Sequence, residues 1–363
     1  MIENNVRDTR ADLLSLEFSE LCELVLSIGE PKYRAKQLFT QLSSGVSPEE
    51  MTNIGKATKE KLAAVSYFYL PKIKRKLVSA VDGTVKYLFE LSDKNCVESV
   101  VMNYSHGLTI CISSQVGCRM GCKFCASTIG GKVRDLTAGE LIGQVIAANA
   151  DMKKRISNIV MMGIGEPLDN YANVLKFLRI VNHPDGVCIG YRHISLSTCG
   201  LADKIDELAK ENIPLTLSIS LHAADDKVRS GIMPVNRKYS IDILLGACRR
   251  YYEKTGRRMS FEYTLIKGQN DSEEDAERLA SVLNSRLRSK SETMPIHVNL
   301  IPVNEVKETG CRPPSREAVR AFCSVLEKRG IRATVRRTLG PDINASCGQL
   351  RRAEADQDKK DQL

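Results

Sequence analysis

The chain has 363 residues, of which 42% are hydrophobic, enough for a sizeable core and for more than one typical domain. Lys and Arg outnumber Asp and Glu by 53 to 44, and the resulting net charge of +9 favours a polyanionic partner such as RNA. No apolar run of about 18 or more residues and no secretory leader occur, so we expect a soluble cytoplasmic protein that is neither secreted nor membrane-bound.

Residues 1–75 are predicted to form a small helical unit. Apolar residues recur at helical spacing from Ser19 onward, and a second amphipathic helix is predicted over 33–42. A further short helix is predicted to begin at Ser47. Cations collect towards the end of this unit, either as solvated helix faces or as a nucleic-acid contact surface: Lys56, Lys59, Lys61, Lys72, Lys74, Arg75 and Lys76.

Residues 76–103 are predicted to form a β-hairpin extension. A strand over 76–81 meets the turn Asp82-Gly83, and a second strand follows over 84–91. A third strand is expected over 97–102. It carries Glu98, which is unusual on a strand that is otherwise largely apolar.

From residue 104 to 345 the pattern alternates between strands and helices. A capping box, Thr137-Ala-Gly-Glu140, predicts one helix start. About seven strands alternating with helices predict an α/β fold, either a parallel barrel or an open sheet. The strands are expected at 108–113, 158–162, 193–197, 214–221, 259–265, 296–301 and 331–337, and the later helices at 171–181, 201–210, 240–253, 272–287 and 315–329.

Three cysteines follow the first of these strands within one short loop, as Cys118-Arg-Met-Gly-Cys122-Lys-Phe-Cys125. A closed zinc site needs four protein ligands, and a 4Fe–4S cluster is usually held by four thiolates. Three thiols on one loop therefore indicate a cluster with one iron open to a ligand that is not protein. A zinc site completed by a distant ligand is the alternative.

Polar residues and glycines gather where the predicted parallel strands end. Because the carboxyl ends of parallel strands meet at one edge, we expect these residues to surround one ligand site. Each of them taken alone is more typical of a helix cap or a structural hydrogen bond. The set comprises Gly165 and Glu166 after the second strand, Ser197 on the third, Ser220, Leu221 and His222 at the fourth, and Asn304 after the sixth.

Two further cysteines stand near this predicted site. Cys111 lies on the strand that leads into the cysteine loop. Cys347 lies after the last strand among small residues, which suits an accessible nucleophile, although an ordinary half-buried cysteine fits the spacing as well. We expect residues 346–363 to form a loop with this cysteine and a charged tail.

These motifs, in this order, resemble the RlmN-type dual-specificity RNA methyltransferases of the radical S-adenosylmethionine superfamily. The segment 29–38 also looks like the small RNA-binding domain of that family. The matching motifs are Val97-Glu98-Ser-Val, Cys111-Ile-Ser-Ser-Gln-Val-Gly-Cys118, the three loop cysteines, Met161-Met-Gly-Ile-Gly-Glu166-Pro, Leu196-Ser197-Thr, Ser220-Leu-His222, Met233-Pro-Val-Asn236, His297-Val-Asn-Leu-Ile-Pro-Val-Asn304 and Cys347-Gly-Gln-Leu350.

The resemblance implies a partial (β/α)6 radical S-adenosylmethionine barrel over 104–345 and an amino-terminal helical RNA-binding domain over 1–75. It also implies the activity, which is methylation of C2 of one adenine in 23S rRNA at the peptidyl-transferase centre. The adenine next to the anticodon of some tRNAs would be a second substrate. An electron donor such as flavodoxin and a monomeric chain are expected.

The resemblance further implies the cofactors and the residue roles. One 4Fe–4S cluster would be held by Cys118, Cys122 and Cys125, and two S-adenosylmethionine molecules would be used per turnover. Cys347 would carry the methyl group as S-methylcysteine, and Glu98 would act as the base. Cys111 would release the product by forming a transient disulfide with Cys347. The implied S-adenosylmethionine site consists of Gly165, Glu166, Ser197, Ser220, Leu221, His222 and Asn304.

Two alternatives remain at the level of sequence. The close relatives of Cfr type methylate C8 of adenine with the same cysteines, although Pro167 and the Pro302-Val303 pair look more like the C2 group. A non-catalytic iron–sulfur or zinc RNA-binding protein is the alternative from another functional class, and it would not need Cys111 or Cys347.

Overall fold

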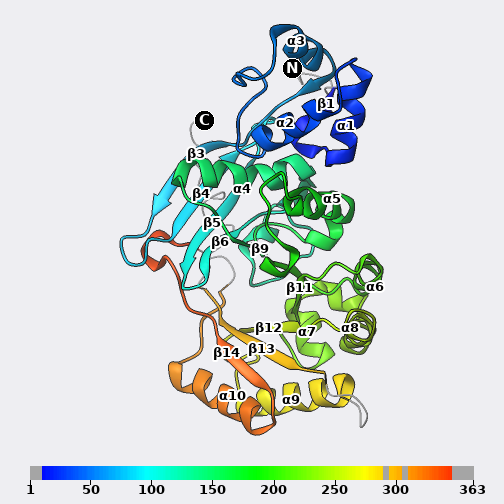
Figure 1. The fold of residues 1–363 in the computed structure, drawn as a ribbon. Helices are drawn as coiled ribbons and strands as arrows, with labels where there is room; N and C mark the ends of the chain where they lie inside the picture. Colours follow the sequence, from blue (N-terminus) through cyan, green and yellow to red (C-terminus); the bar gives the residue numbers. More distant parts are fainter. Residues whose placement is uncertain (1–9, 289–293, 305–309, 346–363) are drawn as a thin grey trace, which may run out of the picture.

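The computed structural model describes residues 10–288, 294–304 and 310–345, and its centre is a ten-stranded sheet (Figure 1). The strand order is β14-β13-β12-β11-β10-β9-β6-β5-β4-β3. The strands are β3 (Lys72–Val78), β4 (Val85–Glu90), β5 (Cys96–Tyr104), β6 (Gly107–Cys111), β9 (Asn158–Met161), β10 (Ile194–Thr198), β11 (Thr216–Ser220), β12 (Met259–Leu265), β13 (Ile296–Pro302) and β14 (Arg332–Val335).

The sheet changes character at β6. From β6 to β14 all neighbours pair in parallel, whereas β3, β4, β5 and β6 pair antiparallel. The two edge strands, β3 and β14, are far apart in the strand order, so the barrel is open. The predicted α/β fold with a partial barrel is confirmed, and the predicted hairpin extension lengthens the same sheet.

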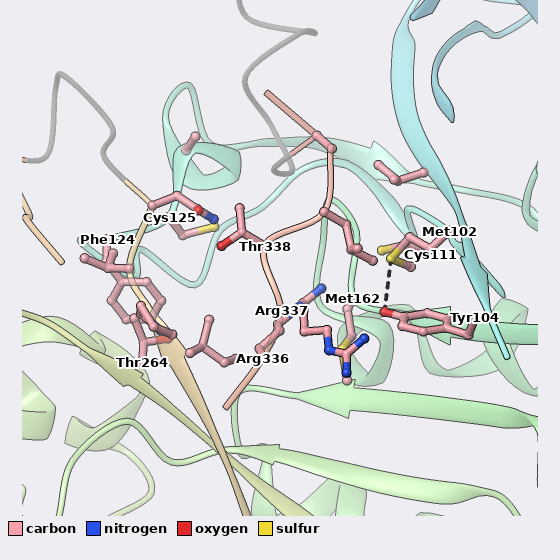
Figure 2. Close-up of a pocket in the computed structure, with 18 residues that line it drawn as sticks. Met102, Tyr104, Cys111, Phe124, Cys125, Met162, Thr264, Arg336, Arg337 and Thr338 are labelled. Carbon is pink, nitrogen blue, oxygen red and sulfur yellow. Dashed lines mark hydrogen bonds between the residues drawn. The ribbon is translucent and has the colours of Figure 1, made fainter. Parts of the chain in front are cut away.

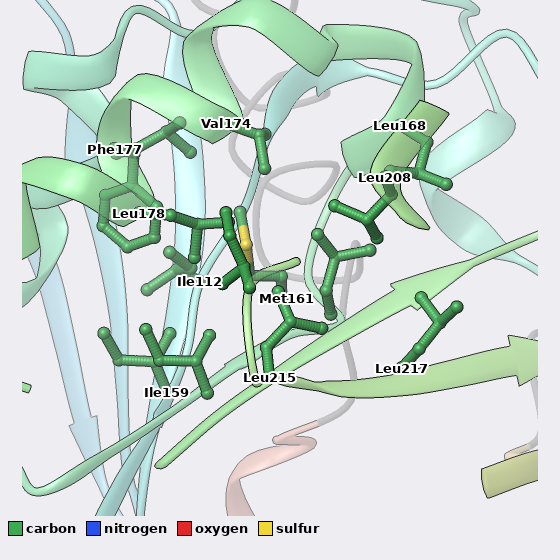
Figure 3. Close-up of a cluster of buried hydrophobic side chains, with 14 of the residues drawn as sticks. Ile112, Ile159, Met161, Leu168, Val174, Phe177, Leu178, Leu208, Leu215 and Leu217 are labelled. Carbon is green, nitrogen blue, oxygen red and sulfur yellow. The ribbon is translucent and has the colours of Figure 1, made fainter. Parts of the chain in front are cut away.

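Helices connect the parallel strands and cover the outer face of the curved sheet (Figure 1). The core lies between the two layers, where Met161 and Leu217 of the sheet pack against Phe177 and Leu208 of α5 and α6 (Figure 3). No helix of the described residues is long and apolar enough to cross a membrane. The helices are α4 (Ala138–Met152), α5 (Tyr171–Asn182), α6 (Ala202–Glu211), α7 (Asp226–Ile232), α8 (Ile241–Thr255), α9 (Glu273–Leu287) and α10 (Arg316–Lys328).

The amino-terminal unit consists of α1 (Phe18–Ser27), α2 (Tyr33–Leu42) and α3 (Lys56–Val65), with a short parallel pair of β1 (Ala11–Asp12) and β2 (Ser66–Tyr67). Polar contacts join this unit to the first two helices of the barrel. Ser15 accepts a hydrogen bond from the Gly139 amide at 2.8 Å, and Lys176 lies 2.7 Å from Glu20.

Two predicted elements differ from the structure. The short helix expected at Ser47 is wrong, because residues 48–50 form a turn and α3 begins only at Lys56. The strand expected over 76–81 begins earlier, as β3 starts at Lys72 and ends at Val78. The capping box of α4 is confirmed, since the Thr137 hydroxyl accepts from the Glu140 amide and the Glu140 side chain accepts from the Thr137 amide.

A buried arginine joins the loops at the carboxyl edge of the barrel. Arg229 on α7 is fully buried and donates to the carbonyl oxygens of Leu221 at 2.9 Å and Cys199 at 2.8 Å. Its guanidinium also donates to Ser220, Asn236 and Tyr239. One cation therefore organises the loops that follow β10 and β11.

The residue that follows Leu221 is also fixed by hydrogen bonds. His222 is buried, has a φ of 57°, and accepts a hydrogen bond from the Thr264 amide through Nδ1 at 2.9 Å. Burial, and to a lesser extent the positive charge of Arg229, lowers the pKa of His222 to about 3. The imidazole is therefore neutral at pH 7.

We expect Arg229→Met to lower the free energy of unfolding by at least about 3 kcal/mol, because several buried acceptors would lose their donor. Urea unfolding of the full chain measures this change. Arg250→Met is the control, since the exposed Arg250 pairs only with Asp206 at 2.7 Å and its loss should cost less than about 1 kcal/mol. Equal losses in the two variants would contradict the role of Arg229.

We expect His222 to make the folded state less stable in acid. The unfolded chain takes up this proton near pH 6.5, whereas the folded imidazole does so only near pH 3. The contribution of the neutral imidazole to the free energy of unfolding is therefore complete above pH 6.5. It falls with the pH and is smaller by about 2 kcal/mol at pH 5.

The comparison variant is His222→Asn, which keeps an acceptor and tolerates the left-handed backbone. Its free energy of unfolding should fall less between pH 7 and pH 5 than that of the parent chain. Identical pH slopes would rule out the buried, neutral imidazole.

Candidate active site

The cysteine loop lies at the tip of a small antiparallel hairpin formed by β7 (Gln115–Gly117) and β8 (Lys132–Asp135). The Cys118 amide donates to the Gly131 carbonyl at 3.0 Å, and the Lys123 amide donates to Ile232 at 2.9 Å. Gly117 has a φ of 80°, and a Cβ there would lie 2.0 Å from the Gly131 oxygen. Only glycine therefore fits where the loop leaves the hairpin.

Two of the loop thiols are buried and the third is half-buried. Cys118 is 6% exposed, Cys122 is 9% exposed, and Cys125 is more open. Burial, and to a lesser extent the charge of the nearby Cys125 sulfur, raises the pKa of Cys118 to about 12. The same two causes raise the pKa of Cys122. These neighbouring thiols can be deprotonated together only if a cationic group neutralises their charge. The iron of an iron–sulfur cluster fits this requirement.

A site for a single metal ion needs its ligands closer together than a cluster does. Within the residues that the structure describes, no group of three or more His, Cys, Asp or Glu side chains is arranged to hold one metal ion. No disulfide links the described cysteines either.

Glu166 lies beside the cysteine loop and is held by backbone groups. One carboxylate oxygen accepts from the Cys199 amide at 2.7 Å, and the other accepts from the Leu168 amide at 3.1 Å. Burial raises the pKa of this carboxyl, while the hydrogen bond from Cys199 partly offsets the rise. Glu166 thus ties the loop after β9 to the loop after β10.

Gly165 has a role that the sequence did not reveal. Its φ is 108°, and a Cβ there would lie 2.7 Å from Gln115 and Ser114. The glycine lets the loop after β9 approach the start of the cysteine hairpin. The atoms that would crowd a side chain at Gly165 therefore belong to the protein itself, in Ser114 and Gln115.

The remaining predicted strand-end residues occupy the same carboxyl edge. The His222 ring stacks edge-on against Phe124 of the cysteine loop, with centroids 4.9 Å apart. Leu221 is buried, while Ser220 and Ser197 are half-buried at the ends of their strands. The cysteine loop and the ends of β9, β10 and β11 therefore form one continuous surface.

A cavity of about 230 Å³ opens next to this surface (Figure 2). Cys125 and Phe124 lie on one side of it and Cys111 and Met162 on the other, with Arg337 between them. The full lining is Val100, Met102, Tyr104, Cys111, Phe124, Cys125, Ala126, Met162, Thr264, Ile301, Pro302, Val303, Asn304, Arg336, Arg337, Thr338, Leu339 and Ala345.

The cavity brings together some predicted site residues and leaves others outside. Cys111, Cys125 and Asn304 line it, although they come from distant parts of the chain. Cys347 lies outside the described residues, which end at Ala345 in the cavity wall. The predicted residues that do not line the cavity are Glu98, Cys118, Cys122, Gly165, Glu166, Ser197, Ser220, Leu221 and His222.

Glu98 lies deep in the sheet. It is 0% exposed and lies on the same face of β5 as Val100 and Met102, both of which line the cavity. Its carboxylate lies 3.0 Å from the Lys86 ammonium, which is 1% exposed. Sequence reasoning missed Lys86, and its only signal was a lysine between the apolar neighbours Val85 and Tyr87.

The cations near the cysteine loop are mostly paired within the chain. Arg119 and Lys132 both contact Asp169, and Arg134 contacts Asp93 and Glu140. Phosphate binding by these three side chains would require their ion pairs to open. Arg336 and Arg337, which the sequence did not single out, are exposed at the cavity itself.

Known families match most of this architecture. Residues 112–280 match the radical SAM superfamily, and residues 11–68 match the ribosomal RNA large subunit methyltransferase N-terminal domain. A probable dual-specificity RNA methyltransferase RlmN of Alkaliphilus oremlandii is 52% identical over 94% of this chain and 98% of its own length. The corresponding protein of Clostridium acetobutylicum is 48% identical over 94% and 97%.

A solved structure agrees with these sequence matches. The crystal structure of a radical SAM methyltransferase from Sphaerobacter thermophilus superimposes with a TM-score of 0.87 at 41% identity, covering 93% of this chain and 98% of that one. With half of its residues identical to such relatives along nearly its full length, the chain belongs to the RlmN family of radical SAM methyltransferases.

Proposed function

We propose that this chain methylates C2 of a specific adenine in 23S rRNA, at the peptidyl-transferase centre, and of the adenine next to the anticodon in tRNA. Its relatives are named dual-specificity RNA methyltransferases. One juxtaposition supports this activity most directly: Cys111, Cys125 and Ala345 line the same cavity. A second cysteine thus stands beside the cysteine loop, and the segment leading to Cys347 reaches the same wall.

A 4Fe–4S cluster and two molecules of S-adenosylmethionine per turnover supply the radical chemistry that side chains cannot provide. Cys118, Cys122 and Cys125 hold the cluster. The buried thiols of Cys118 and Cys122, which resist deprotonation unless a cation neutralises them, support this assignment. Gly165, Glu166, Ser197, Ser220, Leu221, His222 and Asn304 form the S-adenosylmethionine site on the carboxyl edge.

The thiols of Cys347 and Cys111 handle the transferred carbon. C2 of adenine has no lone pair and cannot displace the methyl group of a sulfonium, so Cys347 first carries that methyl group on its sulfur. The methyl group would lose one hydrogen atom to the radical that the cofactors supply. Once the carbon is bonded to C2, Glu98 would accept the proton that C2 loses, and the remaining electron would return to the cluster. Glu98 is buried beside the cavity-lining part of β5, which supports this role.

Cys111 then releases the RNA. Its thiolate attacks the Cys347 sulfur, a disulfide forms, and the bond between sulfur and the transferred carbon breaks. The electron pair stays on that carbon, which takes up a proton and becomes the methyl group on C2. Cellular thiols re-reduce the disulfide, as expected in the cytoplasm. Cys111 is only 4% exposed, so attack by competing thiols is limited.

The target adenine must leave its stack to reach the cavity, which favours a loop in the RNA. The amino-terminal unit and the exposed cations Lys72, Lys74 and Arg75 on β3 bind the surrounding phosphates. An electron donor such as flavodoxin supplies electrons, and the chain acts as a monomer.

We expect RNA from cells that contain this chain to yield 2-methyladenosine, and RNA from cells that lack it to yield none. Mass spectrometry of digested 23S rRNA and tRNA measures the nucleoside. Cys347→Ala should abolish the product, whereas Cys188→Ala, at an exposed cysteine that does not line the cavity, should not. Finding 8-methyladenosine instead would disprove C2 as the target.

We expect Cys111→Ala to accumulate as a covalent complex with RNA, because the carbon would be bonded to both C2 and Cys347 with no thiol to release it. Denaturing gel electrophoresis with nuclease treatment detects the complex. The double variant Cys111→Ala/Cys347→Ala should show none. Normal methylation by Cys111→Ala without an adduct would remove Cys111 from the reaction.

A further inference from the structure

We propose that the turn between β3 and β4, together with Lys86, positions the segment that leads to Cys347 against Cys111. We call Ser79, Ala80, Asp82 and Lys86 the β3–β4 anchor. This inference rests on the proposed function, because Cys347 and Cys111 are its thiol pair. Lys86 is a positioning residue, since it acts through the backbone that precedes Cys347.

The turn and the segment hold each other through two aspartates, one from each side. The Asp342 carboxylate accepts from the Ser79 hydroxyl at 2.6 Å and from the Ala80 amide at 2.9 Å. In return, the Asp82 carboxylate accepts from the Gly340 amide at 2.8 Å. These contacts join parts of the chain that are about 260 residues apart in sequence, as the separation of 258 between Asp82 and Gly340 shows.

Both aspartates are stabilised in their charged form. The hydrogen bond from Gly340 lowers the pKa of Asp82 to about 2, and the hydrogen bond from Ser79 lowers the pKa of Asp342. The contacts therefore persist across the range of pH in which the protein would work.

Lys86 makes the deepest contact of the anchor. Its ammonium is 1% exposed and donates to the Asn344 carbonyl at 2.9 Å, while Glu98 lies 3.0 Å away. Burying a lysine is costly unless its charge and its donors are matched. Here the match includes the proposed base and a backbone oxygen three residues before Cys347.

The anchored segment is a tight turn that faces Cys111. Gly340 has a φ of 57°, and the Ala345 amide donates back to its carbonyl at 3.1 Å. Leu339 and Ala345 pack against the cluster formed by Cys111, Val100 and Met102. Since the anchor holds both ends of this turn, it fixes the point from which the chain continues towards Cys347.

The anchor lies outside the regions that define the superfamily. Neither residues 11–68 nor residues 112–280 include it or the turn at 340–345. The antiparallel extension of the sheet thus has a use beyond stability, because its β3–β4 turn and β4 supply the anchor.

The test measures the effective concentration of the Cys111–Cys347 thiol pair in the full-length holoenzyme. Anaerobic equilibration with glutathione buffers, followed by thiol alkylation and peptide mass spectrometry, gives the fraction of this disulfide. Lys86→Met and Asp342→Ala should lower the effective concentration at least roughly tenfold and threefold, respectively, through lost hydrogen bonds to charged groups. Asp206→Ala, at a half-buried aspartate of α6 paired with Arg250, should leave it unchanged.

A second readout separates positioning from general loss of stability. In Lys86→Met and Asp342→Ala, the number of S-adenosylmethionine molecules cleaved per methyl group transferred should rise. Loss of folded protein would instead lower cleavage and methyl transfer together and leave their ratio unchanged. If Lys86→Met does not fold, Asp342→Ala still tests the anchor, because Asp342 is exposed and its replacement should not unfold the chain.

Effective concentrations within roughly twofold of the parent value in folded Asp342→Ala and Lys86→Met would overturn the anchor and leave the proposed function intact. If Cys111 and Cys347 form no disulfide in the parent chain, the proposed release step fails as well. Reduced effective concentration in both variants, with Asp206→Ala unaffected, supports the anchor.

Discussion

The parallel pairing of β6 with β9 fixes the position of the candidate site. Cys111 pairs with Val160 at the end of the ladder, and the backbone pairing continues past both strands. Gly163 donates to Ile112 at 3.1 Å, and Ser114 donates to Ile164 at 2.7 Å. The cysteine hairpin and the loop with Glu166 are thus parts of one hydrogen-bonded ribbon.

This close approach leaves no space for side chains at two positions. A Cβ at Gly163 would lie 2.5 Å from the Ile112 oxygen, and one at Gly165 would lie 2.7 Å from Gln115. The glycines look like part of a ligand cradle in the sequence. In the structure they permit the loop after β9 to pack against the start of the cysteine hairpin. This packing determines the geometry of the site.

Buried charges hold the site through backbone groups. Arg229 donates to carbonyls of two loops, Glu166 accepts from amides of two loops, and Lys86 donates to Asn344. Each charged group is desolvated, and each spans segments that the chain order separates. Such contacts cost little once all partners are present and much if one is missing, so the loops are held in one arrangement.

Local patterns in the sequence were enough to predict most elements of the barrel and the cysteine loop. The capping box at Thr137 is an example, because its hydrogen bonds span three residues. Lys86 and Arg229 could not be predicted in the same way, since their partners are distant in sequence or are backbone oxygens without a residue signature. The helix predicted at Ser47 is wrong for the opposite reason, because a local helix-start pattern gives only a single turn there.

The open barrel leaves two strand edges exposed, and the chain protects them differently from a closed barrel. On β3 every residue except Leu77 is exposed, and the register shifts between Ile73 and Arg75. A bulge and a row of lysines on an edge strand oppose the addition of another strand. The charges that we assign to phosphate contact would therefore also keep neighbouring molecules from joining their sheets, and a neutralised β3 would be a starting point for aggregation.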